Sequence, residues 1–147
     1  MKYYVYTDAC SSAERKKSSY GFLILTDDRY ITSDGGALTM CTPTYAEDYA
    51  IGLACQYITD NIDINEDDIV TVYTDCAAAI KLFKTLLKVE NFKERDNDLA
   101  SKSITRARVL SSKCKFRFYK VKGHRDKLNP NTFVDRIAKV YLRAKED

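Results

Sequence analysis

The sequence of 147 residues has no tryptophan, one histidine and two prolines, and its apolar runs are short. A run such as residues 22–25 is far below the roughly 20 residues that a membrane-spanning helix needs. Five cysteines with a single histidine form no close pair and no zinc cluster, so we expect reduced thiols. No apolar leader precedes the first strand pattern. We therefore expect no membrane segment and an intracellular, cytoplasmic location, with a nuclear or virus-associated location left open.

The net charge of +3 is small, but its distribution along the chain is uneven. Residues 102–127 hold ten basic side chains and one acidic side chain, and Phe116, Phe118 and Tyr119 are interleaved with them. Such a segment suits contact with a nucleic-acid backbone, although a solvated basic surface would have the same composition. A composition of 45% hydrophobic and 31% charged residues is typical of a globular protein.

The hydrophobic pattern changes period along the chain and predicts a mixed α/β fold. Period-two and β-branched runs predict five strands, and apolar residues at helical spacing predict four helices. The expected strands are residues 3–7, 20–26, 30–38, 69–74 and 114–121. The expected helices are residues 44–58, 77–88, about 98–110 and 132–143. Three strands in a meander followed by a crossover predict an antiparallel part joined to a parallel part.

Two nearly identical hexapeptides, Val5–Cys10 and Val72–Ala77, lie 67 residues apart. Each brings a strand pattern to an acidic residue, Asp8 in the first copy and Asp75 in the second. If the two strands are parallel neighbours, both carboxylates emerge together at one edge of the sheet. Their repulsion, roughly 4 kcal/mol at an effective dielectric constant of 20, favours a divalent cation between them.

Two further acids lie where the helical pattern predicts apolar surroundings. Glu47 lies in line with the apolar face of the first helix, and Asp135 lies in the first turn of the last helix. Either acid alone could favour the positive end of a helix dipole. The predicted crossover could, however, bring all four acids to one sheet edge.

Five ordered motifs give the chain a specific resemblance to the type I ribonuclease H family, from Tyr6 to about Ala138. They are the Tyr-Thr-Asp ending at Asp8, Thr42 with Ala46-Glu47, the Tyr-Thr-Asp ending at Asp75, residues 121–124 (Val-Lys-Gly-His), and Asn131 with Asp135 and Ala138.

The resemblance implies a single ribonuclease H-like domain over residues 1–147, with a five-stranded mixed sheet in the order 3-2-1-4-5 and helices on both faces. It implies that Asp8, Glu47, Asp75 and Asp135 hold two Mg²⁺ ions, for which Mn²⁺ could substitute, and that the RNA strand of an RNA/DNA hybrid is hydrolysed to 5′-phosphate and 3′-hydroxyl ends. It also implies that His124 assists proton transfer or product departure.

The resemblance implies that substrate-contacting residues lie around the first strand, the first helix start and the second aspartate. Our candidates are Ala9, Cys10, Thr42, Thr44, Cys76, Lys122 and Asn131. The sequence departs from the family pattern in several of them: Ala9 replaces a common glycine, Thr44 a common asparagine and Cys76 a common serine. We expect a monomer that binds nucleic acid. The alternatives are a structure-selective, resolvase-like DNA nuclease of the same fold and a non-catalytic nucleic-acid-binding module.

Overall fold

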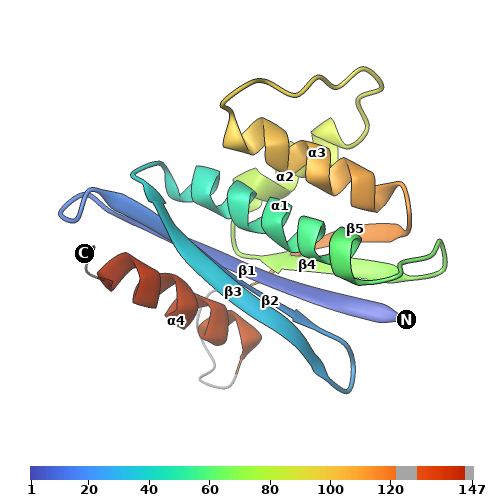
Figure 1. Ribbon diagram of the computed structural model, residues 1–147, viewed down its shortest axis with the longest axis horizontal. Coiled ribbons are helices and arrows are strands. Elements are labelled where there is room, and N and C mark those ends of the chain that lie inside the picture. Colours follow the sequence, from blue (N-terminus) through green and yellow to red (C-terminus); the bar gives the residue numbers. More distant parts are fainter. Residues whose placement is uncertain (122–128, 145–147) are drawn as a thin grey trace.

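A computed structural model describes residues 1–121 and 129–144 of the protein. They form a five-stranded sheet and four helices in three layers. Figure 1 shows α1, α2 and α3 on one side of the sheet and α4 on the other. The elements in chain order are β1 (Lys2–Ser12), β2 (Lys17–Leu25), β3 (Tyr30–Thr39), α1 (Pro43–Asn61), β4 (Ile69–Thr74), α2 (Ala77–Leu86), α3 (Leu99–Ser111), β5 (Lys115–Lys120) and α4 (Pro130–Arg143).

The strand order β3-β2-β1-β4-β5 confirms the predicted sheet. Strands β1, β2 and β3 are antiparallel, whereas β4 is parallel to both β1 and β5. All nine predicted elements are present, with boundaries that shift by a few residues. The largest shifts are in α1, which runs to Asn61 rather than residue 58, and in β1 and β2, which extend toward each other.

The prediction that the first strand ends at Asp8 is wrong. β1 continues to Ser12 and pairs with β2 from Tyr4↔Leu25 to Ser12↔Lys17, so Asp8 lies within the strand opposite Gly21. The residues between the predicted strands 3–7 and 20–26 were not assigned to a strand, but most of them form this hairpin, and Lys16 has the positive φ of 52° that a tight turn needs. The Ser-rich sequence here pairs its hydroxyls across the strands, as in Ser11 with Ser18.

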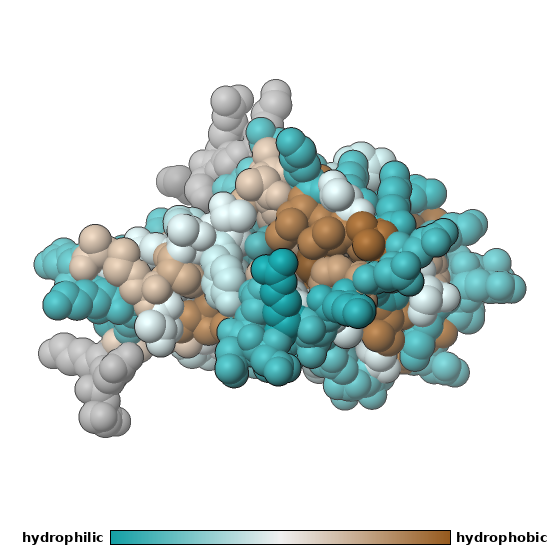
Figure 2. Space-filling model, turned by 90° about the horizontal axis from the view of Figure 1, so that it is seen from above, coloured by the Kyte–Doolittle hydropathy of each residue, from teal (hydrophilic) through white to brown (hydrophobic). Residues whose placement is uncertain are grey.

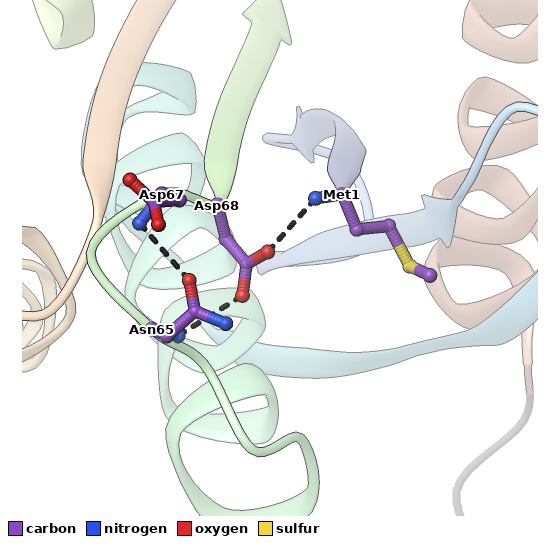
Figure 3. Close-up of polar contacts among 4 residues, drawn as sticks. All are labelled: Met1, Asn65, Asp67 and Asp68. Carbon is purple, nitrogen blue, oxygen red and sulfur yellow. Dashed lines mark hydrogen bonds and ion pairs between the residues drawn. The ribbon is translucent and has the colours of Figure 1, made fainter.

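The register between β1 and β4 matches the offset of the sequence repeat. Lys2 pairs with Ile69 and Tyr6 with Tyr73, and both pairs are 67 residues apart (69 − 2 and 73 − 6). Asp68 fixes the start of β4, because its carboxylate accepts hydrogen bonds from the amine of Met1 at 2.9 Å and from the backbone N–H of Asn65 at 3.0 Å (Figure 3). Both donors stabilise the ionised carboxylate, so the pKa of Asp68 is lowered. This contact joins the start of β1 to the start of β4 and so supports the register in which the two copies of the repeat lie side by side.

The first helix begins with a defined cap and packs closely on its neighbours. The Thr42 hydroxyl accepts a hydrogen bond from the N–H of Tyr45, and Pro43 occupies the first helical turn. Gly52 allows close packing on α3, since a Cβ at this position would lie only 2.6 Å from Cα of Ser103. The core beneath α1 is aliphatic and includes Val5, Ile24, Ile51 and Val72. These contacts hold the start of α1 over the ends of β1 and β4.

Residues 87–98 join α2 to α3 through turns rather than through a further helix. Arg108 holds this connection, because its guanidinium donates to the carbonyl of Leu86 at 2.7 Å and lies over the ring of Phe92. Figure 2 shows an apolar area among charged side chains on this side of the molecule. A hollow of about 550 Å³ there is lined by Leu82, Leu86 and Phe92 among others.

In the described part of the chain, no helix combines the length and apolarity needed to cross a membrane. All five cysteines have free thiols.

Candidate metal and nucleic-acid site

Three of the four predicted carboxylates meet where Asp8 lies within β1, Asp75 follows the last residue of β4 and Glu47 lies near the start of α1. Carboxylate oxygens of Asp8, Glu47 and Asp75 lie within 4.8 Å of one another. Asp135, from the first turns of α4, joins them in lining a hollow of about 370 Å³. Asp8 and Glu47 are buried, whereas Asp75 is exposed. Strand β1, strand β4, helix α1 and helix α4 therefore each contribute one acid to the same hollow.

Two threonines hold Glu47 in place. The hydroxyl of Thr7 donates a hydrogen bond to Oε1 of Glu47, and the hydroxyl of Thr74 donates to the same oxygen at 2.7 Å. Thr74 also accepts a hydrogen bond from the N–H of Cys76 at 3.1 Å. The two hydroxyls satisfy a carboxylate whose residue is only 2% exposed.

Sequence reasoning missed these two threonines, although the repeat contained the signal that identifies them. Each Tyr-Thr-Asp copy sends its threonine toward α1 and its aspartate into the hollow. The tyrosines of the two copies stack, with ring centroids 4.8 Å apart and planes inclined by 12°. In the two copies, therefore, the tyrosines stack on each other, the threonines donate to the same oxygen of Glu47, and the aspartates line the same hollow.

The crowded carboxylates perturb one another. Burial, followed by the negative charge of Glu47, raises the pKa of Asp8, and the N–H of Ala9 partly opposes this rise. Burial also raises the pKa of Glu47, and the hydrogen bonds from Thr7 and Thr74 oppose it. Raised pKa values mean that the ionised cluster is destabilised when no cation is bound.

The donor set fits a hard divalent cation. Its ligands would be carboxylate oxygens, which Mg²⁺ and Mn²⁺ prefer, and the hollow contains neither a histidine nor a basic side chain in its described lining. At the rim, Lys139 forms an ion pair with Asp135 at 2.9 Å. Ion pairs between residues i and i+4 on a helix surface are weak, so a bound cation could replace Lys139 as the partner of Asp135.

The structure brings three of the predicted substrate contacts to the carboxylates. Ala9, Thr44 and Cys76 line the same hollow, and the Cys76 thiol lies 3.8 Å from the Thr44 hydroxyl. Cys10 is half-buried beside them, where burial and then the charges of Asp8 and Asp135 raise the pKa of its thiol, while Ser19 and Lys139 oppose the rise.

The remaining predicted contacts differ in their positions. Thr42 caps α1 and is exposed, but its side-chain oxygen is already engaged by the N–H of Tyr45. The last helix was predicted to begin at residue 132, which left Asn131 outside it, and this is wrong: Asn131 is buried in the first turn of α4, because Asn129 caps that helix and it begins two residues earlier than expected. Lys122 and His124 lie outside the described residues.

Asp48 is a buried acid that the sequence analysis did not single out. It follows Glu47 on α1 and is only 3% exposed, and no described group donates a hydrogen bond to its Oδ1. Burial raises the pKa of Asp48 to about 7. Its charge also contributes to the raised pKa of Glu47.

We expect Asp48→Asn to stabilise the protein at pH 8 by about 2 kcal/mol, because it removes an uncompensated buried charge. The pKa of Asp48 is higher in the folded state than its ordinary value of 3.8, so the destabilisation is absent at pH 4 and develops as the pH rises through about 7. Thermal melting of parent and variant at the two pH values measures this difference.

Asp63→Asn is the matched control, because Asp63 is exposed. An equal change in melting temperature for both variants, or a gain that is as large at pH 4 as at pH 8, would contradict the assigned burial of Asp48.

Comparisons with known proteins agree with this geometry. The RNase H family model matches residues 1–143. No curated protein matches the sequence. The structure resembles RNase H1 from the halophilic archaeon Halobacterium salinarum, with a TM-score of 0.70 and 17% identity over 97% of this chain and 98% of that one.

Two other solved structures are similar. The N-terminal RNase H domain of Rv2228c from Mycobacterium tuberculosis has a TM-score of 0.68 and 19% identity, covering 96% of this chain and 93% of that one. LC11-RNase H1, solved in complex with an RNA/DNA hybrid, has a TM-score of 0.68 and 15% identity, covering 95% and 96% of the two chains. With a family model matched over residues 1–143, the chain belongs to the RNase H family.

Proposed function

We propose that the protein is a metal-dependent endonuclease that hydrolyses the RNA strand of RNA/DNA hybrids and leaves 5′-phosphate and 3′-hydroxyl ends. The observation that carries this proposal is the hollow into which β1, β4, α1 and α4 each contribute one carboxylate. Membership of the RNase H family supports it, as does the likeness to an RNase H1 solved with a hybrid.

We propose that Asp8, Glu47, Asp75 and Asp135 hold two divalent cations, Mg²⁺ or Mn²⁺. When bound, such cations activate the attacking water and stabilise charge on the leaving oxygen of the phosphodiester. The acids provide a set of negative oxygens, and the threonines orient the most buried of them, Glu47. His124 is proposed to assist proton transfer or product departure, a role for which an imidazole side chain is suited in general.

The residues beside the carboxylates are proposed to place the substrate. Ala9, Thr44 and Cys76 share the hollow with the acids, so a phosphodiester bound there would contact their backbone or side-chain polar groups. Cys10 lies near the charges of Asp8 and Asp135, and Asn131 lies in the first turn of α4. Thr42 and Lys122 are proposed to contact the nucleic-acid backbone next to the cleaved bond.

The proposal is tested by incubating the protein with end-labelled RNA/DNA hybrid, double-stranded RNA and branched DNA, in Mg²⁺ and in Mn²⁺. We expect cleavage of the RNA strand of the hybrid, none by Asp75→Asn, and full activity in Asp67→Asn. The first variant removes an acid of the hollow, and the second removes an exposed acid from the connection before β4.

Other outcomes would assign the protein to a different function. Cleavage confined to branched DNA would indicate a resolvase-like nuclease. Binding of nucleic acid without cleavage in either metal would indicate a non-catalytic module.

A further inference from the structure

Three tyrosines form a row across the sheet directly beside the carboxylates. The register places Tyr6, Tyr73 and Tyr119 opposite one another on β1, β4 and β5. Tyr6 and Tyr73 stack at 4.8 Å, and Tyr73 and Tyr119 stack at 5.9 Å with planes inclined by 18°. We call these three residues the tyrosine row.

The tyrosine row lies on the sheet face that also carries Asp8. Side chains alternate between faces along a strand, so Tyr6 and Asp8 share one face while Thr7 faces α1, where it contacts Glu47. On the row's face, α4 packs against β1, β2 and β3, and it lies opposite α1 in Figure 1. Toward β5 the row becomes accessible, and Tyr119 is 54% exposed.

The charge changes sign across the tyrosine row. Asp8 and Asp75 lie two residues beyond Tyr6 and Tyr73 along their strands. On the other side of the row, the same face of β5 carries Arg117 and then Lys115, both exposed. Beside Tyr4, which precedes the row on β1, lies an acid from the turn between β2 and β3: the Tyr4 hydroxyl donates to Asp27 at 2.5 Å. A polyanion that crosses the row is therefore attracted toward β5 rather than toward β2.

A basic hollow adjoins the β5 end of the tyrosine row. It has a volume of about 650 Å³ and lies between α2 and the edge strand β5, around the edge of the sheet from the face that carries the row. Its described lining includes Lys84, Lys88 and Arg117, together with Tyr119, and contains no carboxylate. An exposed aromatic ring beside a positively charged hollow is the combination by which proteins hold single-stranded nucleic acid without reading its sequence.

We propose that the tyrosine row and the adjoining basic hollow bind an unpaired strand of nucleic acid that extends from the cleaved duplex. This inference rests on the proposed nuclease function and specifies its substrate as a hybrid that carries a single-stranded tail. A base of the tail stacks on the outer face of Tyr119, whose ring is supported from behind by Tyr73 and Tyr6, and the phosphates of the tail lie near Arg117, Lys84 and Lys88. The path of the tail begins beside Asp8 and Asp75, which lie two residues beyond Tyr6 and Tyr73, and it ends at the edge of the sheet.

The test compares the dissociation constants of a blunt RNA/DNA hybrid and of the same hybrid with a single-stranded oligothymidine tail. Fluorescence anisotropy of the labelled hybrids, measured in EDTA, keeps cleavage out of the measurement. We expect the protein to bind the tailed hybrid about tenfold more tightly, as stacking of one or two bases would give. Tyr119→Leu and Tyr73→Leu should reduce this preference severalfold.

Tyr119→Phe and Tyr73→Phe are the matched controls, because phenylalanine keeps the aromatic face and should keep the tail preference. Arg117→Gln should lower the slope of log affinity for the tailed hybrid against log salt by about 0.7, the contribution of one phosphate contact in a single strand. Tyr119 and Arg117 are exposed, so their variants remain informative even if Tyr73→Leu fails to fold.

Equal affinities for tailed and blunt hybrid, or equal losses in the leucine and phenylalanine variants, would overturn the inference. If equal affinities coincided with self-association that Tyr119→Leu abolishes, the face would be a protein interface instead. Cleavage of the blunt hybrid in Mg²⁺ tests the nuclease function separately. A tail preference without cleavage would support tail binding while rejecting the nuclease.

Discussion

Replacing Asp8 with asparagine is expected to abolish metal-dependent cleavage and to raise the melting temperature of the metal-free protein. Activity should fall by roughly 10³-fold or more, because a lost ligand removes several kcal/mol of charge stabilisation. Stability without metal should rise by about 1 to 2 kcal/mol, since Asp8 lies buried among Glu47, Asp75 and Asp135.

The pH dependence of the melting temperature is an independent test of the stability gain expected for Asp8→Asn. The pKa of Asp8 is raised from 3.8 to about 8, so its ionisation costs stability as the pH rises through this range, and the cost is absent below about pH 4. In EDTA, the melting temperature of the parent should therefore fall more between pH 5 and pH 8 than that of Asp8→Asn.

Adding Mg²⁺ at pH 8 should stabilise the parent and have little effect on Asp8→Asn. Asp67→Asn, which changes an exposed acid away from the cluster, should behave as the parent does. If neither Mg²⁺ nor Mn²⁺ changed the melting temperature of the parent, the proposed cation site would be excluded.

The double variant Thr7→Val with Thr74→Val is expected to lose about 2 to 4 kcal/mol of folding stability at pH 8. Valine keeps the volume of threonine but removes both hydroxyls that donate to Oε1 of Glu47. The buried carboxylate then has neither donor, and its pKa rises further. Cleavage should fall about 10- to 100-fold, as is typical when the groups that orient a metal ligand are removed.

Serine separates the hydroxyl from the shape of the side chain. Thr7→Ser with Thr74→Ser keeps both donors and should recover most of the cleavage rate. Thr71→Val is a matched control, because Thr71 is buried on β4 but faces away from α1. Equal losses of activity in the valine and serine pairs would show that the threonines act through packing and not through Glu47. Thermal melting and initial cleavage rates measure both effects.

The sheet order was predicted through the resemblance to the type I ribonuclease H family, whereas the four candidate acids were also marked by local patterns in the sequence. The Tyr-Thr-Asp repeat predicted two neighbouring strands, and Glu47 stood out because helical spacing placed a carboxylate on an apolar face. The continuation of β1 beyond Asp8 was not predictable in this way. Residues 9–12 are small and polar, and they remain in a strand because β2 pairs with them, which is a long-range contact.

The roles of Thr7, Thr74 and Asp48 also depend on tertiary contacts. A threonine in a strand is ordinary, and only the position of α1 above the sheet turns these two hydroxyls toward one oxygen of Glu47. Asp48 was not singled out in the sequence, yet the packing around α1 leaves it only 3% exposed. Asn131 was left outside the predicted helix because the helix begins two residues earlier than predicted, after an asparagine cap that the hydrophobic spacing does not reveal.

The continuation of β1 past Asp8 divides the carboxylates into a rigid and an adjustable half. Asp8 has paired strand on both sides of it, and Glu47 is held by two hydroxyls, so these two acids have little room to move. Asp75 is exposed beyond the end of β4, and Asp135 forms an ion pair with Lys139 at the rim. Mg²⁺ needs oxygens at about 2.0 to 2.1 Å and Ca²⁺ at about 2.3 to 2.6 Å. Discrimination between cations by ionic radius therefore depends on how far Asp75 and Asp135 can move, while Asp8 and Glu47 serve as the fixed reference.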